Sequence, residues 1–161
     1  IRDDLVTGVQ TCALPIWLPE VEPVSSGMDL AFWDRVLAVR EAVSKELERL
    51  RIAGGIGSSL DAEVDLYCDA GLAEQLNRLG DELRFALITS YARVNAADAR
   101  PAEVLETDIK GLWLTVAPSD HRKCIRCWHH REDVGSNSEH PEICARCVEN
   151  VTGAGEARQY A

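Results

Sequence analysis

The stretch KCIRCWHHREDVGSNSEHPEICARCVEN, residues 123–150, contains two closely spaced cysteine pairs. Cys124 and Cys127 form one C-x-x-C motif, Cys144 and Cys147 form a second, and sixteen residues separate the two motifs. Two residues between thiolates allow a tight turn to direct both sulfurs at one point, where backbone N–H groups can hydrogen-bond them. The pattern therefore predicts one structural Zn²⁺ held by these four cysteines.

The alternatives for these cysteines are a redox-active pair and an iron centre. His129, His130 and His140 lie close by, but four cysteines at this spacing already complete a tetrahedral ligand set without a histidine. Because protein side chains fill every position, the metal is expected to fold the segment and not to catalyse a reaction. A segment this short has too small a core to fold otherwise.

Flat rings and cations surround the first cysteine pair, namely Arg126, Trp128, His129, His130 and Arg131. Such groups stack on unpaired bases and contact phosphates, so they are candidate RNA-binding residues. The alternative is that Trp128 covers the small core while Arg126 and Arg131 are only solvated.

No catalytic residue can be singled out. The glycines of AGGIGSS, residues 53–59, follow a helical pattern instead of opening one, so they are read as a helix terminator and not as a phosphate loop. The acidic residues are scattered over expected helix faces.

The 161 residues carry a net charge of −10, and this charge is unevenly distributed. Residues 1–120 hold 11 Lys and Arg against 21 Asp and Glu, whereas residues 121–161 hold six of each. The tail is therefore a compositionally distinct unit. Paired cysteines favour a reducing, cytoplasmic compartment, and no apolar run reaches the ~20 residues needed to span a bilayer. Cys68 is expected to be a small buried strand residue.

The remaining pattern predicts an α+β fold. An amphipathic helix is expected over 29–51, followed by a strand in 59–68, a helix in 70–80, and strands within DELRFALITSYARV (81–94) and GLWLTVAPS (111–119). The long helix should bury a stripe formed by Trp33, Val36, Leu37, Val43, Leu47 and Leu50. Its basic residues either contact nucleic acid or form a solvated face. The four-cysteine ribbon or finger completes the chain.

The sequence resembles the C-terminal end of bacterial isoleucyl-tRNA synthetases, which are class I aminoacyl-tRNA synthetases. The resemblance rests on FWDRVLAVREAVSKELE, IGSSLDAEVDLY, LGDELRFALITS and above all the cysteine-rich tail, and it runs from Trp17 to Ala161. It implies a connector at 17–28, the last helix of the anticodon-binding helical domain at 29–53, a small α+β subdomain at 54–118 and a zinc-binding tail at 119–161.

The resemblance also implies what the chain binds. The four cysteines would be zinc ligands, and the tail would contact isoleucine tRNA on its anticodon-arm side. The longer parent enzyme uses ATP and Mg²⁺ on a catalytic body and carries an editing domain. Neither is expected in these residues, so the chain is expected to be inactive by itself, monomeric, and a partner of that missing N-terminal body.

Two other classes stay open. Formamidopyrimidine-type DNA glycosylases end in a similar four-cysteine finger that grips duplex DNA, but here an acidic strand–helix–strand unit precedes the finger and Ile1 begins the chain. A free-standing zinc-ribbon adaptor is the third class.

The stretch VTGVQTCALPI, residues 6–16, has neither a helical nor a strand period. It resembles the translation of a common sequencing-library adapter, and the family resemblance begins immediately after it. Residues 1–16 are therefore expected to be a non-native, adapter-derived segment that takes no part in the fold.

Overall fold

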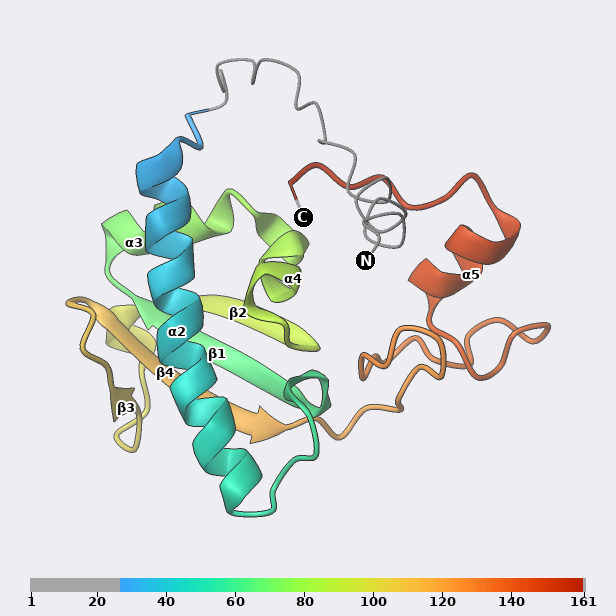
Figure 1. Ribbon diagram of the computed structural model, residues 1–161, viewed down its shortest axis with the longest axis horizontal. Coiled ribbons are helices and arrows are strands. Elements are labelled where there is room, and N and C mark those ends of the chain that lie inside the picture. Colours follow the sequence, from blue (N-terminus) through green and yellow to red (C-terminus); the bar gives the residue numbers. More distant parts are fainter. Residues whose placement is uncertain (1–26, 161) are drawn as a thin grey trace, which may run out of the picture.

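The computed structural model describes residues 27–160. The adapter-like segment 1–16 and most of the expected connector lie outside this range. Figure 1 shows a long helix across a small sheet, with the cysteine-rich tail set to one side. The helices are α2 (Leu30–Ile52), α3 (Ala70–Asn77), α4 (Leu83–Leu87) and α5 (Ala145–Thr152), and the strands are β1 (Ala62–Cys68), β2 (Tyr91–Ala96), β3 (Leu105–Glu106) and β4 (Leu112–Pro118).

Helix α2 begins and ends where the sequence predicts. The Asp29 side chain caps it by accepting the Phe32 backbone N–H at 2.9 Å, and Gly54, with φ of +77°, follows its end. The buried face consists of Phe32, Val36, Val39, Val43 and Leu47. The assignment of Leu37 to this face was wrong, because its side chain is 54% exposed.

The sheet has the strand order β2-β1-β4-β3. Strand β1 pairs parallel with β2 and antiparallel with β4, and β3 pairs antiparallel with β4. Along β1, Ala62, Val64, Leu66 and Cys68 are buried against the helices while the intervening residues face the other side. The alternation predicted from the sequence is confirmed. The parallel β1–β2 pair requires the crossover through α3 and α4.

The segment 81–94 departs from the predicted strand. Leu83 and Leu87 lie one helical turn apart and are both buried in α4, so burial of this apolar pair outweighs the β-forming composition. Ile88 ends the helix in the left-handed region, at φ of +58°, and the strand begins only at Tyr91. The two-residue strand β3 was not predicted either.

Cys68 is 1% exposed at the end of β1. Burial, followed by the nearby Asp69 carboxylate, raises the pKa of its thiol to about 11. The predicted role as a small buried strand residue is confirmed.

The tail has its own small cluster of buried residues, separate from the main core. Cys124, Val134, Ile143, Cys144 and Cys147 form it. The main core instead unites α2, α3, α4 and the inner face of the sheet. None of the described helices is both long enough and apolar enough to cross a membrane.

Two leucines of α2 test the register of this helix. Leu47→Ala is expected to destabilise the protein by about 2–4 kcal/mol, because it opens a cavity in the core. Leu37→Ala is expected to change the free energy of unfolding by less than about 0.5 kcal/mol, since this side chain is mostly in water. Urea unfolding of both variants measures the difference, and equal losses would contradict the register.

Candidate metal centre

The first cysteine pair lies on a tight hairpin. Lys123 and His130 form an antiparallel bridge, and within it the Cys124 N–H donates to the His129 carbonyl at 2.9 Å. The Trp128 N–H donates to the Cys124 carbonyl at 2.9 Å, and Trp128 takes a left-handed conformation with φ of +66°. This turn brings the Cys124 and Cys127 side chains to the same side, as the C-x-x-C spacing requires.

The second pair lies at the start of α5. Cys144 is the N-cap residue, and Cys147 sits in the first turn. The Cys144 N–H points at the Cys124 sulfur, 3.4 Å away, and so joins the two motifs directly. The positive end of the helix dipole favours thiolates at this position.

The four sulfurs have the separation that a tetrahedral metal demands. All lie within 4.8 Å of one another, and Cys127 Sγ is 3.7 Å from Cys144 Sγ. Four sulfurs at ~2.3 Å from Zn²⁺ are separated by about 3.8 Å from each other. Three of the cysteines are buried and Cys127 is half-buried. The donor set therefore fits one zinc with no position open to water, which defines a structural site.

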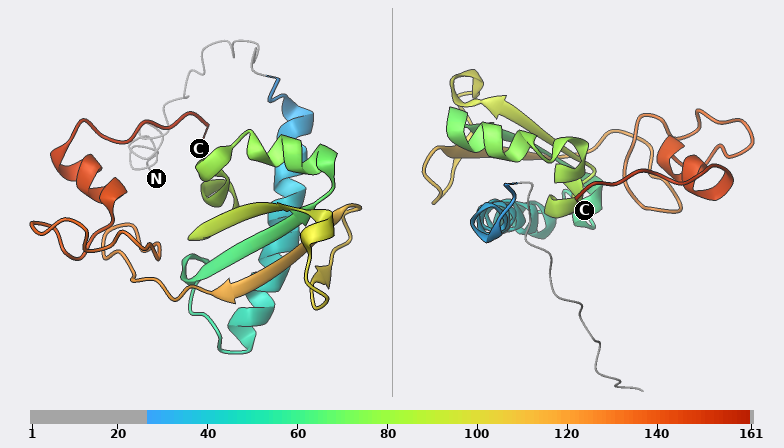
Figure 2. Two further views of the ribbon diagram at one scale, coloured as in Figure 1. Left: turned by 180° about the vertical axis from the view of Figure 1, so that it is seen from behind. Right: turned by 90° about the horizontal axis from the view of Figure 1, so that it is seen from above.

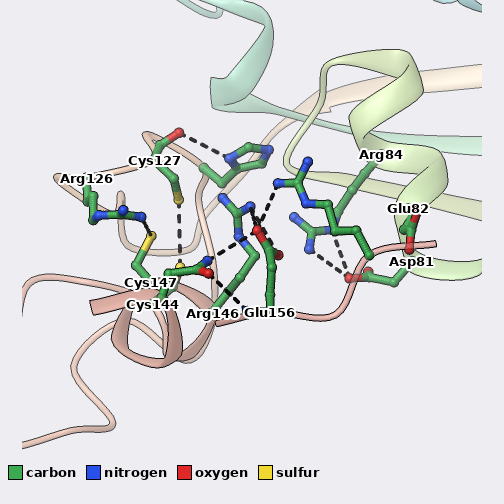
Figure 3. Close-up of polar contacts among 12 residues, drawn as sticks. Asp81, Glu82, Arg84, Arg126, Cys127, Cys144, Arg146, Cys147 and Glu156 are labelled. Atoms are coloured by element: carbon green, nitrogen blue, oxygen red, sulfur yellow. Dashed lines mark hydrogen bonds and ion pairs between the residues drawn. The ribbon is translucent and has the colours of Figure 1, made fainter. Parts of the chain in front are cut away.

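Polar groups lie close to the sulfurs, and they favour negative charge on Cys127 (Figure 3). Arg126 Nη1 lies 3.6 Å from the Cys147 sulfur. The hydrogen bond from Cys144 lowers the pKa of Cys127, with further help from His129 and Arg146, whereas the hydrogen bond to Cys127 raises the pKa of Cys144. One thiolate is thus favoured before metal arrives, and a bound divalent cation would favour all four.

The predicted RNA-binding residues separate into an exposed and an interior group. Trp128 is 62% exposed, and its neighbours Arg126 and Ile125 also face solvent. Trp128 therefore does not cover the small core, which was the structural alternative for this residue.

The interior group consists of His129, His130 and Arg131. The His129 ring is 8% exposed and packs edge-on against Phe85, with ring centroids 5.7 Å apart. Arg131 is half-buried, and its guanidinium lies 4.2 Å from the Tyr91 ring centroid. These side chains join the tail to the α+β unit instead of projecting toward solvent.

His130 lies at the centre of this junction. Its N–H donates to Ser90 Oγ at 2.6 Å, its Nδ1 donates to the His121 carbonyl at 2.7 Å, and its Nε2 lies 3.3 Å from Asp61 Oδ1. Lys123 Nζ donates to the same Asp61 oxygen at 2.9 Å.

Asp61 connects two parts of the chain through its two oxygens. Oδ1 faces the tail, whereas Oδ2 accepts the backbone N–H groups of Gly57 and Ser58 at 3.1 and 2.8 Å. Burial would raise the pKa of this carboxyl, but the hydrogen bonds from Lys123, Ser58 and Gly57 outweigh it and lower the pKa to about 2. Sequence reasoning missed Asp61 and Ser90, because no motif marks a residue whose partners lie tens of positions away.

The C-terminal residues return to the α+β unit. The Glu82 carboxylate accepts the Gln159 and Tyr160 N–H groups at 2.7 and 2.6 Å. Glu156 accepts from Arg146 at 3.0 Å, beside a cleft of about 350 Å³ that borders Cys127 and Cys144 (Figure 3). Three guanidinium groups surround the Phe85 ring, those of Arg84, Arg146 and Arg158, at 4.1, 5.0 and 4.1 Å from its centroid. These contacts fix the metal centre against α4.

The fold and the site define a zinc-finger protein. Residues 122–150 match the family described as the zinc finger found in FPG and IleRS.

Comparison with individual proteins shows which enzymes the chain is similar to beyond the finger itself. The chain is 63% identical over 131 residues to the isoleucine–tRNA ligase of Nitrosococcus oceani, 58% over 140 residues to that of Thioalkalivibrio sulfidiphilus and 57% over 139 residues to that of Pseudomonas putida. These matches cover 81–86% of the chain but only 14–15% of each relative. The chain is thus homologous to the C-terminal region of bacterial isoleucine–tRNA ligases and spans about 15% of their length.

Removal of one ligand tests the metal centre. The protein is expected to contain one zinc per chain, and Cys124→Ser should abolish stoichiometric zinc and unfold the tail, because the free energy of metal binding is the folding energy of such a segment. Metal analysis and limited proteolysis of residues 119–160 measure both effects. Cys68→Ala, at a buried cysteine outside the cluster, is the matched control and should retain the zinc. A tail that stays protease-resistant after chelation would contradict a structural role for the metal.

Replacement of Ser90 tests the junction. Ser90→Ala leaves the half-buried His130 N–H without its acceptor, so faster exchange of this amide and a loss of stability of about 1–3 kcal/mol are expected, with the zinc content unchanged. NMR hydrogen exchange and urea unfolding measure these effects, with the exposed Ser44→Ala as control. Unchanged exchange at His130 would mean that Ser90 does not hold the tail in place.

Proposed function

We propose that this chain is the C-terminal zinc-bearing part of an isoleucine–tRNA ligase and that it contacts isoleucine tRNA on the anticodon-arm side. The observation that carries the proposal is the 55–63% identity to isoleucine–tRNA ligases, which extends far beyond the cysteine-rich segment. A finger alone recurs in unrelated contexts, whereas a match over 131–140 residues also includes the helix and the sheet.

In this proposal the chain binds tRNA and takes no direct part in the aminoacylation reaction. The whole ligase would join isoleucine to its tRNA with ATP and Mg²⁺, using parts of the relatives that these residues do not span. Helix α2 would end the anticodon-binding helical domain, residues 54–118 would form the α+β subdomain, and residues 119–161 the zinc-binding tail. The chain alone is proposed to be inactive in aminoacylation.

The zinc would act on RNA binding through the hairpin that it fixes. Cys124, Cys127, Cys144 and Cys147 would hold the ion, and the hairpin would present Trp128 and Arg126 outward. Trp128 is 62% exposed on a closed turn, so little backbone entropy is left to lose when a base stacks on its indole. His129, His130 and Arg131 would support this surface from inside, since they contact Phe85, Ser90 and Tyr91 of the α+β unit.

The second candidate is the duplex-binding finger of a formamidopyrimidine-type DNA glycosylase. The family description names FPG as well as IleRS, which is the observation in its favour. The sheet and helix that precede the finger match isoleucine–tRNA ligases over most of the chain, and this supports the first proposal.

A binding comparison tests the proposal. The zinc-loaded chain should prefer isoleucine tRNA over an unrelated tRNA and over duplex DNA at one fixed salt concentration, since affinities are comparable only at equal salt. Trp128→Ala should weaken tRNA binding about 5- to 100-fold, because stacking of one base on an aromatic ring contributes ~1–3 kcal/mol. Fluorescence anisotropy of labelled nucleic acids measures the affinities.

Trp128→Phe is the matched control, because it keeps an aromatic face at the same position. It should retain most of the affinity. Preference for duplex DNA would favour the glycosylase-type function, and equal affinities for Trp128→Ala and the unsubstituted chain would remove Trp128 from the binding surface.

A further inference from the structure

The sheet has one covered face and one open face. Figure 2 shows it from the side opposite α2, where no α-helix of the described part of the chain lies over β2, β1 and β4, while the short 3₁₀ helix Ala97–Ala99 contacts β1 at the end of this face. The strand register assigns three rows of side chains to this open face: Tyr91, Glu63 and Ala117; Arg93, Asp65 and Thr115; and Asn95, Tyr67 and Trp113.

The composition of the open face differs from that of a packing surface. Ala117 is the one aliphatic residue in the three rows, whereas the covered face of the same strands carries Val64, Leu66, Val94 and Leu114. Burying the open face under another protein layer would desolvate several charged groups with no aliphatic area in return. The face is therefore suited to a polar, planar ligand.

Guanidinium groups lie over the aromatic rings of this face. Arg100 lies 4.4 Å from the Trp113 ring centroid, and Arg131 and Arg93 lie 4.2 and 5.7 Å from that of Tyr91. The rings stand at both ends of the face, about 13 Å apart along a strand, at ~3.3 Å per residue. Both aromatic rings and guanidinium planes are surfaces on which unpaired bases stack.

The centre of the face presents hydrogen-bonding groups. Arg93 donates to Asp65 Oδ1 and to Glu63 Oε2, at 2.7 Å each, and Asn95 lies in the adjoining row. Carboxylates repel phosphate groups but accept hydrogen bonds from the amino groups of bases. A strand of nucleic acid on this face would consequently turn its bases toward the sheet and its phosphates toward solvent.

The open face is continuous with the zinc-bearing tail. The Tyr91 ring contacts both Arg131 and the His121 ring, and its hydroxyl accepts the Glu132 N–H at 3.4 Å. The open face and the tail therefore meet at Tyr91.

We infer that the open face of β2-β1-β4 is a second RNA-binding surface, on which Tyr67 and Trp113 stack unpaired nucleotides of the tRNA held by the tail. The choice of RNA as the ligand rests on the proposed function. The placement rests on the register, the ring–cation pairs and the continuity with the tail. In some RNA-binding proteins, two or three aromatic side chains on the open face of a sheet are enough to stack single-stranded bases.

Three substitutions on this face test the inference. Trp113→Leu should weaken binding of isoleucine tRNA about 5- to 100-fold. Arg100→Gln and Thr115→Glu should each weaken it by about fivefold or more, because one removes a stacking cation and the other adds a negative charge between the rings. Thr115→Glu deletes no aromatic packing, so it reports on RNA contact even where Trp113→Leu disturbs the fold.

Matched controls lie at the two ends of α3, which packs against the other face. Arg78→Gln and Ala70→Glu make the same changes in charge at exposed positions and should leave the affinity within about twofold. Zinc content and circular dichroism verify that each variant is folded. The loss of tRNA affinity caused by Trp113→Leu should persist at raised salt concentration, since salt screens stacking less than it screens phosphate contacts.

The outcomes separate the two proposals. If Trp128→Ala weakens tRNA binding while all three sheet variants match their controls, the sheet face does not bind RNA and the inference is wrong, although the proposed function stands. If the zinc-loaded chain shows no preference for tRNA over duplex DNA, the proposed function fails and the inference fails with it. If variants of the hairpin and of the sheet face both lose affinity for isoleucine tRNA, the result supports the proposed function and the inference.

Discussion

Everything in the tail depends on bringing four sulfur atoms from two segments to one point. The tail buries two aliphatic side chains, Val134 and Ile143, besides three of its four cysteines. The free energy gained by burying an apolar cluster of this size is far smaller than the conformational-entropy cost of ordering some thirty residues. Metal coordination by four thiolates can offset that cost, and so it determines whether the hairpin of Trp128 exists as a defined surface.

A few polar contacts fix the metal-bound tail to the α+β unit. Asp61 and Ser90 hold the base of the metal-bound hairpin, and Glu82 holds the returning C-terminal residues. The tail is therefore attached at two places rather than linked by one flexible segment. Aromatic and cationic groups on the hairpin and on the open face of the sheet consequently share one frame, which a ligand spanning both surfaces requires.

Much of this structure could be predicted from local patterns. Helix α2, the alternation along β1 and the grouping of the four cysteines all depend on spacing within a short stretch, and the structure confirms them. The strand expected in 81–94 was wrong in its first half, because β-forming residues there are recruited into α4 by burial of Leu83 and Leu87. Leu37 fitted the helical period, but its side chain is exposed, because within residues 27–160 no other element covers this part of α2.

Contacts between distant residues could not be predicted in this way. The partners of His130 and Glu82 are separated from them by 40 and 78 positions, and nothing in the local composition marks either pair. The outward position of Trp128 likewise depends on a left-handed backbone conformation that sequence spacing does not specify.

Zinc K-edge X-ray absorption of the purified chain tests the central claim most directly, because it measures the ligands themselves. The account predicts a single shell of four sulfurs at ~2.3 Å, with no nitrogen or oxygen neighbour. A histidine or water ligand in the first shell would contradict the closed four-cysteine site, and with it the structural basis of the binding surface.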